Sequence, residues 1–449
     1  MALEFRSAWR RAAIRIVDAA RRTDALKLLP GLQESQWRSP AELAALQAER
    51  LAELGRFCLA EVSAYREPFH DLGIAAEGLT PETLARLPLM TKERARVLGN
   101  ALRSRSFRRW QPRPKATSGS TGMPFNYYLD RPSHSYQWAH LWRGWSQVGY
   151  RPGDPYVTLS GGSLVPEKVD LKQRLYLALS GAVHLPSYHL DAGVLERYRR
   201  VLERRGAGFL YGYPSSVSML AEHLLAAGGP RPPLRAVFTT SENLAPRARA
   251  TIEEAFGCPC IDTYGCNDGG VYAFECERRD GFHVGQESVF VEIVDDDGRP
   301  LPEGEIGRIV TTNLAIRAMP LLRYVTGDLG ALTTEPCACG RGLQRIVKLQ
   351  GRERDVVVTP AGRRVHGAFF NHFAPFYRAE WLRRFQVYQP DRRALVLRLV
   401  VHREPTAVER EELLTELRRG LGEMDYRIEI VDRLEETRTG KFRVVVSDL

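Results

Sequence analysis

Between Thr117 and Pro124 the sequence is dense in glycine and hydroxyl side chains, reading Thr-Ser-Gly-Ser-Thr-Gly-Met-Pro. Glycines let backbone N–H groups approach an anion closely, and serine and threonine hydroxyls add hydrogen-bond donors to phosphate oxygens. The Gly-Lys-Ser/Thr ending of a Walker A loop is absent. Taken alone, the segment fits a triphosphate-binding loop and a flexible Ser/Gly loop equally well. The residues that would contact phosphate are Ser118, Gly119, Ser120, Thr121 and Gly122.

Four further motifs follow this segment in order along the chain. Tyr-Gly-Cys-Asn-Asp (264–268) follows a predicted strand, and Tyr-Val-Thr-Gly-Asp (324–328) is a predicted strand ending in a turn with a carboxylate. Gly-Arg-Glu-Arg-Asp occupies 351–355, and Thr-Arg-Thr-Gly-Lys-Phe-Arg occupies 437–443. Each motif alone is typical of an ordinary turn. Together, in this order and spacing, the motifs are hard to obtain by chance and favour one shared function.

A second group of residues could bind a metal. Cys337 and Cys339 form a tight thiol pair on a predicted turn, and Cys276 and His283 lie upstream. Three thiolates and one imidazole would complete a tetrahedral zinc site, and four protein ligands would make that site structural. The alternative is four unliganded residues that happen to lie near turns. A competing Cys-Pro-Cys segment at 258–260 starts a predicted strand, where we expect it to be partly buried structure.

The residues of these motifs must be positioned by strands and helices, and the sequence predicts that the two alternate along the chain. From about 110 to 330, short β-rich runs alternate with helical stretches, which predicts a parallel sheet with helices over both faces. A hairpin-like pair is expected at Phe290–Val294 and Arg308–Asn313, and residues 1–105 are expected to be largely helical, with Thr91 as the N-cap of one helix. The clearest predicted strands are Tyr156–Leu159, Gly208–Tyr211, Ala236–Thr240 and Cys260–Tyr264.

After Gly351 the pattern changes to that of a small α+β unit. A helix is expected at Glu409–Gly422. Strands are expected at Asp355–Thr359, Phe385–Gln389, Ala394–Val401 and Arg427–Val431. We therefore predict a large N-terminal domain at 1–350, with a zinc-binding excursion at 276–340, and a small C-terminal domain at 351–449.

Length and composition are those of a folded globular protein. At 449 residues the chain is long enough for two or three compact units, and 44% of its residues are apolar and 26% charged. No apolar run approaches the roughly 20 residues of a membrane span, and arginines interrupt the position of a signal-peptide core. We therefore expect no transmembrane segment and a cytoplasmic location. The odd number of cysteines, seven, argues against a disulfide framework.

The net charge of +10 suits an anionic partner such as a nucleotide or coenzyme A. The arginines are scattered along amphipathic helical stretches, and no nucleic-acid recognition motif accompanies them. We therefore expect a solvated basic surface and no nucleic-acid partner.

The ordered motifs resemble those of the adenylate-forming superfamily, which includes acyl-CoA synthetases, luciferases and peptide-synthetase adenylation domains. Leu-Pro-Leu-Met-Thr-Lys at 87–92 is similar to the Leu-Pro-x-x-Thr-Lys segment of the phenylacetate-CoA ligase and CapK-like branch, and Gly-Lys-Phe-Arg at 440–443 looks CapK-like. The resemblance covers nearly the whole chain from about residue 50. It implies an α/β fold, with a large N-terminal domain of mixed or parallel sheets flanked by helices and a small mobile C-terminal α+β domain that carries a catalytic lysine. It also implies an AMP-forming carboxylate ligase of the acid-thiol type.

By the same resemblance, the motif residues would hold ATP. Ser118–Gly122 would bind the β- and γ-phosphates as pyrophosphate leaves. Asp328 would accept hydrogen bonds from the ribose hydroxyls, and Arg352 would lie beside the ribose and the phosphates. The residues that would frame adenine and the α-phosphate are Ser241, Glu242, Asn243, Tyr264 and Gly265.

Catalysis would depend on Lys441, Asp268 and Arg352. Lys441 would reach in from the small domain and stabilise the charge that develops during in-line attack on the α-phosphorus. Mg²⁺ is expected to bridge phosphate oxygens. Relatives usually have Ser/Thr-Glu after Tyr-Gly-x, whereas this chain has Asn267-Asp268. Asp268 keeps a carboxylate with shorter reach, and we expect it to support Mg²⁺. Many relatives also have a lysine in the phosphate loop, and this chain has none after Pro124. The resemblance further implies a structural zinc on the Cys/His group.

The substrate is expected to be a small carboxylic acid, aryl or apolar, because the candidate pocket residues are aromatic and mostly neutral. These candidates are Trp138, His184, Pro186, Tyr211, Tyr213 and Pro214. Coenzyme A is the expected acceptor. An amine, a carrier protein, or AMP transfer to a substrate, as in relatives that adenylylate a deazaflavin coenzyme, stay open as alternatives, and so does an inactive nucleotide- and zinc-binding scaffold. A homodimer is a further expectation.

Overall fold

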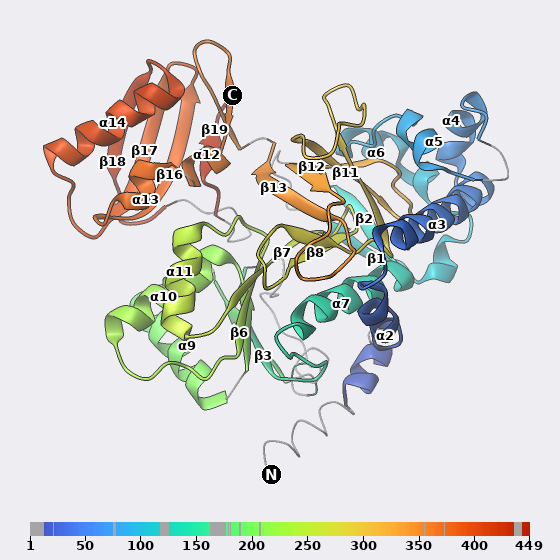
Figure 1. Cartoon of the computed structure of the whole chain (residues 1–449), viewed down its shortest axis with the longest axis horizontal. Helices are drawn as coiled ribbons and strands as arrows, with labels where there is room; N and C mark the ends of the chain where they lie inside the picture. The colour runs from blue at the N-terminus through green and yellow to red at the C-terminus, as the bar shows by residue number, and fades with distance from the viewer. Residues whose placement is uncertain are drawn as a thin grey trace.

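The computed structural model describes most of the chain. The residues that it describes are 13–20, 22–74, 78–116, 125–161, 177, 179, 181–187, 190–205, 208–353, 355–371, 373–434 and 442–449. The predicted phosphate-binding residues Ser118–Gly122 and the predicted catalytic Lys441 lie outside these ranges. Figure 1 shows a large sheet with its helices and, set apart from it, the C-terminal elements in orange and red.

Within the described residues, one mixed sheet of 11 strands forms the centre of the larger part. From edge to edge its strands are β10 (Val289–Val294), β11 (Gly307–Asn313), β12 (Tyr324–Thr333), β13 (Arg345–Arg352), β9 (Phe282–Val284), β8 (Val271–Glu275), β7 (Cys260–Cys266), β6 (Ala236–Thr240), β5 (Phe209–Gly212), β3 (Tyr156–Ser160) and β4 (Ala182–Pro186). Strands β4, β3, β5, β6 and β7 run parallel to their neighbours, as the strand–helix alternation predicts. From β7 across to β10 every neighbouring pair is antiparallel.

Helices cover both faces of the parallel half. They are α7 (Arg131–Ser146), α9 (Ala192–Arg205), α10 (Pro214–Ala227) and α11 (Pro246–Phe256). Leu202 of α9 and Leu220 of α10 lie in one buried cluster with strand residues. On the other face, Trp145 of α7 stacks on Phe238 of β6, with ring centroids 4.5 Å apart. Every residue of β3 and β6 is buried, which is typical of strands enclosed between two layers of helices.

The N-terminal region is largely helical, as predicted. Its elements are α2 (Ala25–Ser35), α3 (Pro40–Glu61), α4 (Arg66–Asp71), α5 (Pro81–Arg86), α6 (Lys92–Leu98), the 3₁₀ segments Ser63–Tyr65, Gly99–Leu102 and Phe107–Trp110, and the hairpin of β1 (Arg113–Ala116) and β2 (Asn126–Leu129). Thr91 is confirmed as the N-cap of α6, since its hydroxyl accepts the Arg94 N–H at 3.2 Å. Helices α3 to α6 share one buried cluster with β2 and with Tyr324 of β12, and α2 shares another with α7 and the parallel strands, so these helices form one body with the large sheet.

The C-terminal part has its own sheet and its own core. Its strands are β14 (Val356–Val358) paired with β15 (Arg364–His366), and the sheet β18 (Asp425–Ile430), β17 (Ala394–Val401), β16 (Leu382–Asp391) and β19 (Val445–Ser447). Its helices are α12 (Ala368–Asn371), α13 (Ala374–Arg378) and α14 (Ala407–Leu421). Leu417 of α14 packs against Val387 and Leu397 of the sheet.

The predicted fold class is confirmed: an α/β chain with a large mixed sheet flanked by helices and a small C-terminal α+β part. The sequence pattern did not predict β19, because three residues that pair in parallel with β16 are too few to give a strand period. No helix among the described residues has the length and apolar character required to traverse a lipid bilayer.

Candidate active site and metal cluster

Asp328, in the middle of β12, is the centre of a polar group with residues near the ends of β7 and β13. The strand predicted to end in a turn at 324–328 continues to Thr333, because β12 stays paired with β13 beyond Asp328. The Tyr264 hydroxyl donates to Asp328 Oδ2 at 2.8 Å, and Arg352 Nε lies 3.2 Å from Oδ1. The preceding Gly327 has φ +81°, a left-handed conformation that favours glycine. Burial, and then the charge of Asp328, raise the pKa of Tyr264 well above its usual value, so its hydroxyl stays protonated and donates. The structure thus brings together three of the predicted nucleotide-binding residues.

Gly265 follows Tyr264 on β7 and is exposed. A Cβ at this position would meet no neighbouring atom closer than 3.8 Å. The space beside the backbone here is therefore open, next to the Asp328 group.

Asp268 lies just beyond β7, and its carboxylate is already hydrogen-bonded. The Tyr324 hydroxyl donates to Oδ2 at 2.5 Å, and Cys266 Sγ lies 3.1 Å from Oδ1. Lys92 Nζ lies 3.7 Å from Oδ2. Burial by itself raises the pKa of Asp268, but Lys92 and the Tyr324 hydroxyl outweigh it, so the pKa lies below the ordinary value. The carboxylate is ionised and keeps lone pairs on both oxygens for a cation.

Lys92 lies beside Asp268, a contact that the sequence pattern did not reveal. It opens α6 directly after the Thr91 cap, and its side chain is 29% exposed beside Asp268. In the sequence, the signal for this contact is the lysine that ends the short motif at 87–92. The structure therefore gives this segment a position next to the predicted Mg²⁺-supporting carboxylate.

The described flanks of the predicted phosphate loop lie beside the same group. Ala116, at the end of β1, pairs with Asn126, at the start of β2. The buried Phe125 stacks on Tyr324, with ring centroids 6.3 Å apart and an interplanar angle of 23°. Tyr324 is the residue whose hydroxyl binds Asp268. The described residues on either side of the segment 117–124 are thus anchored near the Lys92–Asp268 pair.

The turn after β6 carries Ser241, Glu242 and Asn243. Ser241 has φ +72°, a strained conformation for a residue other than glycine. Asn243 Nδ2 donates to the Gln350 carbonyl at 3.0 Å, which ties the turn to the end of β13. The Glu242 carboxylate accepts two backbone N–H groups, from Ser215 at 3.0 Å and from Phe442 at 2.8 Å. These side chains are directed at the backbone of neighbouring elements.

The four predicted zinc ligands lie together. Cys276 follows β8, His283 is on β9, and Cys337 and Cys339 lie between β12 and β13. All their ligand atoms lie within 4.8 Å of one another, with Cys276 Sγ 3.7 Å from Cys337 Sγ and Cys339 Sγ 3.4 Å from His283 Nε2. The donor set, three sulfurs and one imidazole nitrogen, is that of a structural zinc site.

The electrostatics of His283 also suit a metal ligand. Burial, with the nearby Arg341 and Arg345, lowers the pKa of His283 to about 3, so the imidazole is neutral, as coordination requires. The competing thiols Cys258 and Cys260 do not join this cluster.

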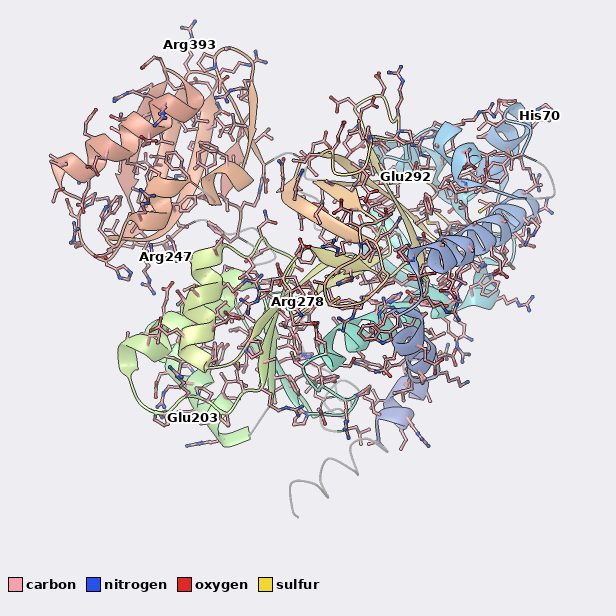
Figure 2. The ribbon with its side chains drawn as sticks, viewed as in Figure 1. His70, Glu203, Arg247, Arg278, Glu292 and Arg393 are labelled. Atoms are coloured by element: carbon pink, nitrogen blue, oxygen red, sulfur yellow. The ribbon has the colours of Figure 1, made fainter. Side chains whose placement is uncertain are left out.

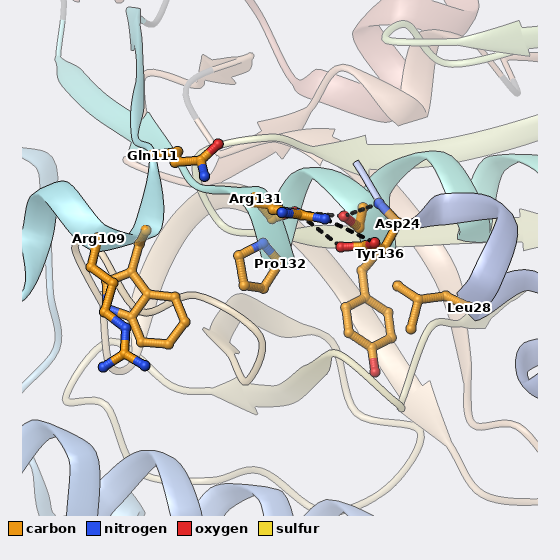
Figure 3. A pocket seen from close by; sticks show the side chains of 9 residues that line it. Asp24, Leu28, Arg109, Gln111, Arg131, Pro132 and Tyr136 are labelled. Carbon is orange, nitrogen blue, oxygen red and sulfur yellow. Dashed lines mark hydrogen bonds and ion pairs between the residues drawn. The ribbon is translucent and has the colours of Figure 1, made fainter. Parts of the chain in front are cut away.

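A separate hollow lies between α2, α7 and the segment before β1. It is a cavity of about 350 Å³ lined by Trp110, Tyr136 and the Asp24–Arg131 ion pair, whose Arg131 Nε lies 2.8 Å from Asp24 Oδ2 (Figure 3). None of its lining residues belongs to the motifs described above.

Comparison with known proteins gives two family matches along the chain. Residues 117–316 match the family described as AMP-binding enzyme, and residues 357–448 match the CapK C-terminal domain. A phenylacetate-coenzyme A ligase of Thermus thermophilus is 29% identical over 71% of this chain and 72% of its own length. Protein CapK of Staphylococcus aureus is 24% identical over 70% of this chain and 69% of its own length.

The solved structures show a similar fold. The crystal structure of 2-hydroxyisobutyryl-CoA ligase in the postadenylation state is 21% identical, covers 92% of this chain and 91% of its own, and has a TM-score of 0.74. The same ligase in the thioesterification state covers 91% of this chain and 90% of its own at 22% identity, with a TM-score of 0.56. The two matches cover nearly the same length of this chain, and the TM-score is higher for the postadenylation state.

Proposed function

The chain belongs to the phenylacetate-CoA ligase and CapK-like branch of the adenylate-forming superfamily, and from this premise we propose that it is an AMP-forming ligase that activates a carboxylic acid with ATP and passes the acyl group to coenzyme A. In the first step a carboxylate oxygen attacks the α-phosphorus, and pyrophosphate leaves. In the second step the thiol attacks the acyl carbonyl, loses its proton, and AMP leaves. The observation that carries the proposal is the grouping of Tyr264, Asp328 and Arg352 from three separate motifs.

The ribose of ATP would bind at Asp328. Its carboxylate accepts one hydrogen bond from Tyr264 and pairs with Arg352, so it is fixed in position and keeps lone pairs for two ribose hydroxyls. The open space beside Gly265 suits a planar base. The Arg352 guanidinium adds a fixed positive charge for the phosphates, and its pKa is raised by Asp328, so it stays charged.

The triphosphate would extend from this point toward Lys92. We assign contacts with the β- and γ-phosphates to Ser118, Gly119, Ser120, Thr121 and Gly122. Lys92 supplies the positive charge that relatives place within the loop, and the anchored flanks of the loop support this role. Asp268, ionised and with free lone pairs, fits Mg²⁺, which when bound would screen the repulsion between the phosphates and the attacking carboxylate.

The small domain would supply the catalytic lysine. We propose that the domains divide at 350/351 and that Lys441, in the segment just before Phe442, neutralises charge on the α-phosphate during attack. The Cys/His cluster would hold a structural zinc ion, because its four donors leave no position for a substrate.

The acid would be aryl or otherwise apolar. Tyr211 of β5 packs edge-on against Trp145 of α7 with ring centroids 5.1 Å apart, and aromatic side chains dominate this part of the chain. An acid-binding pocket lined by such side chains would favour a ring or a short alkyl group over an amino acid.

One experiment tests the reaction, the acid and the acceptor. Purified protein is assayed for ATP–pyrophosphate exchange with a panel of aryl and aliphatic acids, and the products are identified by mass spectrometry with and without coenzyme A. Exchange that depends on an acid, with an acyl-CoA product only when coenzyme A is present, supports the proposal. A chain that gives no exchange with any acid would contradict it, and exchange without acyl-CoA would contradict the assignment of the acceptor.

A further inference from the structure

The Glu242 carboxylate joins the two parts of the molecule. Oε2 accepts the Ser215 N–H at 3.0 Å, in the first turn of α10, and Oε1 accepts the Phe442 N–H at 2.8 Å, from the C-terminal part. A carboxylate at the start of a helix is stabilised by the free N–H groups there. One oxygen therefore fixes the side chain to the large part, and the other holds the backbone of the small part.

Other contacts around this carboxylate also join the large part to the C-terminal part. Arg384 of β16 lies 4.9 Å from the Phe442 ring centroid and reaches Met219 of α10. Arg247 of α11 donates to the Ala379 carbonyl at 3.1 Å, at the junction seen in Figure 2. The Glu242 carboxylate accepts from a backbone N–H and the Arg247 guanidinium donates to a backbone carbonyl, and such charge-assisted bonds are about twice as strong as neutral ones. Of the two, only the Glu242 bond holds Phe442.

Phe442 is the residue next to Lys441 in the sequence. The Phe442 N–H belongs to the peptide bond that joins the two residues, so a contact with this N–H acts on the segment that carries Lys441. The TM-score is higher for the postadenylation state of 2-hydroxyisobutyryl-CoA ligase than for its thioesterification state. A bond that joins the two parts in one arrangement cannot persist when one part rotates away.

We propose that Glu242 is a positioning residue for the adenylation step: it holds the Phe442 amide, next in sequence to the proposed catalytic Lys441, against the large part in the arrangement seen here, and releases it before the acyl group moves to the thiol. This proposal rests on the proposed function. Holding both parts requires both oxygens of the Glu242 side chain, because each oxygen accepts one backbone N–H group. Glutamine would turn an amide NH₂ toward one of the two N–H groups, and aspartate is one methylene too short to span them.

The first test separates the two half-reactions. Glu242→Ala and Glu242→Gln should lower the rate of ATP–pyrophosphate exchange by about 10- to 100-fold, the effect of losing a hydrogen bond to a charged group. Conversion of a supplied acyl-adenylate and coenzyme A to thioester should stay within about twofold of the native rate. The adenylate is made with the acid that the native chain activates best. Equal loss in both half-reactions would show a merely structural role and overturn the proposal.

A matched control lies at the same junction. Glu222 pairs with Arg383 at 2.8 Å across the same two parts but does not contact Phe442. Both groups are partly exposed, and such pairs contribute little. Glu222→Gln should therefore leave both half-reactions near native rates. If Glu222→Gln lowers the rate of ATP–pyrophosphate exchange as much as Glu242→Gln does, the effect belongs to the whole junction. That result would contradict a specific role of Glu242.

The second test does not depend on activity. Hydrogen exchange at the Phe442 amide, read by fragmentation mass spectrometry, should be slow in the native chain and in Glu222→Gln and fast in Glu242→Ala. Unchanged protection in Glu242→Ala would overturn the proposal. If the native chain activates no acid, the proposed function fails. The hydrogen-exchange measurement then decides by itself whether Glu242 holds Phe442.

Discussion

Arg352 lies directly opposite Asp328 in the antiparallel pair of β12 and β13, and its Nε is 3.2 Å from the Asp328 carboxylate. Strand pairing thus sets the distance between the two motif residues, with no contribution from a loop. Arg352 also donates to the Thr326 carbonyl at 2.9 Å, so its guanidinium is held at two points. A nucleotide that binds here meets an acceptor and a cation whose relative position is already fixed, which lowers the entropy cost of binding.

Asp328→Asn should weaken ATP binding. The amide cannot accept from Tyr264, Arg352 and two ribose hydroxyls together, and it loses the charge that Arg352 faces. We expect the KM for ATP in pyrophosphate exchange to rise by about 10- to 100-fold. Asp425→Asn, which removes an exposed partner of Arg427 on β18, is the control and should change the KM by less than about twofold. If the KM of Asp328→Asn for ATP equals that of the native chain, Asp328 does not bind the ribose.

Lys92→Ala should also raise the KM for ATP, because it removes a positive charge beside Asp268 and the anchored flanks of the phosphate loop. We expect a rise of about tenfold or more, with partial recovery in Lys92→Arg, since arginine keeps the charge with a different shape. Lys27→Ala, at a lysine that is 82% exposed, is the matched control. If Lys92→Ala and Lys27→Ala have equal KM values, the triphosphate does not reach Lys92.

The residues that could be predicted from the sequence are those whose position follows from local pattern. Tyr264 and Asp328 belong to short local motifs whose order resembles that of a known family. That resemblance predicted their grouping, because β7 and β12 are not neighbours in the sheet. Thr91 could be predicted as a cap because capping depends on the next three residues only.

The contacts that could not be predicted join segments that only the tertiary structure brings together. Lys92 is on an N-terminal helix and Asp268 follows β7, and no local pattern pairs them. Glu242 accepts hydrogen bonds from Ser215 and Phe442, and no local pattern predicts these partners. The position of Phe442 depends on how the C-terminal part lies against the rest of the chain, which hydrophobic periodicity does not encode.

Zinc removal should destabilise the antiparallel half of the sheet. The cluster joins β8, β9 and the segment between β12 and β13, so an ion there would crosslink them. We expect about one zinc per chain by elemental analysis of protein purified without chelator, and a lower Tm after chelation. Cys339→Ser should lose the metal and lower the Tm, whereas Cys258→Ser should keep it. If Cys258→Ser loses the metal and Cys339→Ser keeps it, the zinc site lies at the Cys-Pro-Cys segment instead.

The buried ion pair of Arg143 and Glu287 should set an acid limit on stability. Their side chains are 0% and 2% exposed, with Nη1 2.6 Å from Oε1. Burial alone raises the pKa of Glu287, but Arg143, His140 and the Ser35 hydroxyl outweigh it and lower the pKa to about 2, compared with roughly 4.3 for an unfolded chain. Since the folded pKa is the lower one, the contribution of Glu287 is fully present above about pH 5 and is lost as the pH falls toward 2.

Urea unfolding from pH 7 to pH 2.5 measures this contribution. The free energy of unfolding of the native chain should fall below about pH 4.5 as Glu287 becomes protonated more readily in the unfolded state. Glu287→Gln leaves the Arg143 charge buried without its partner and should cost about 3–5 kcal/mol at pH 7. The double variant Arg143→Met with Glu287→Leu removes both charges, so it should lose much less stability and show a shallower decline in acid. Equal unfolding free energies for Glu287→Gln and the native chain at pH 7 would show that the pair does not stabilise the fold.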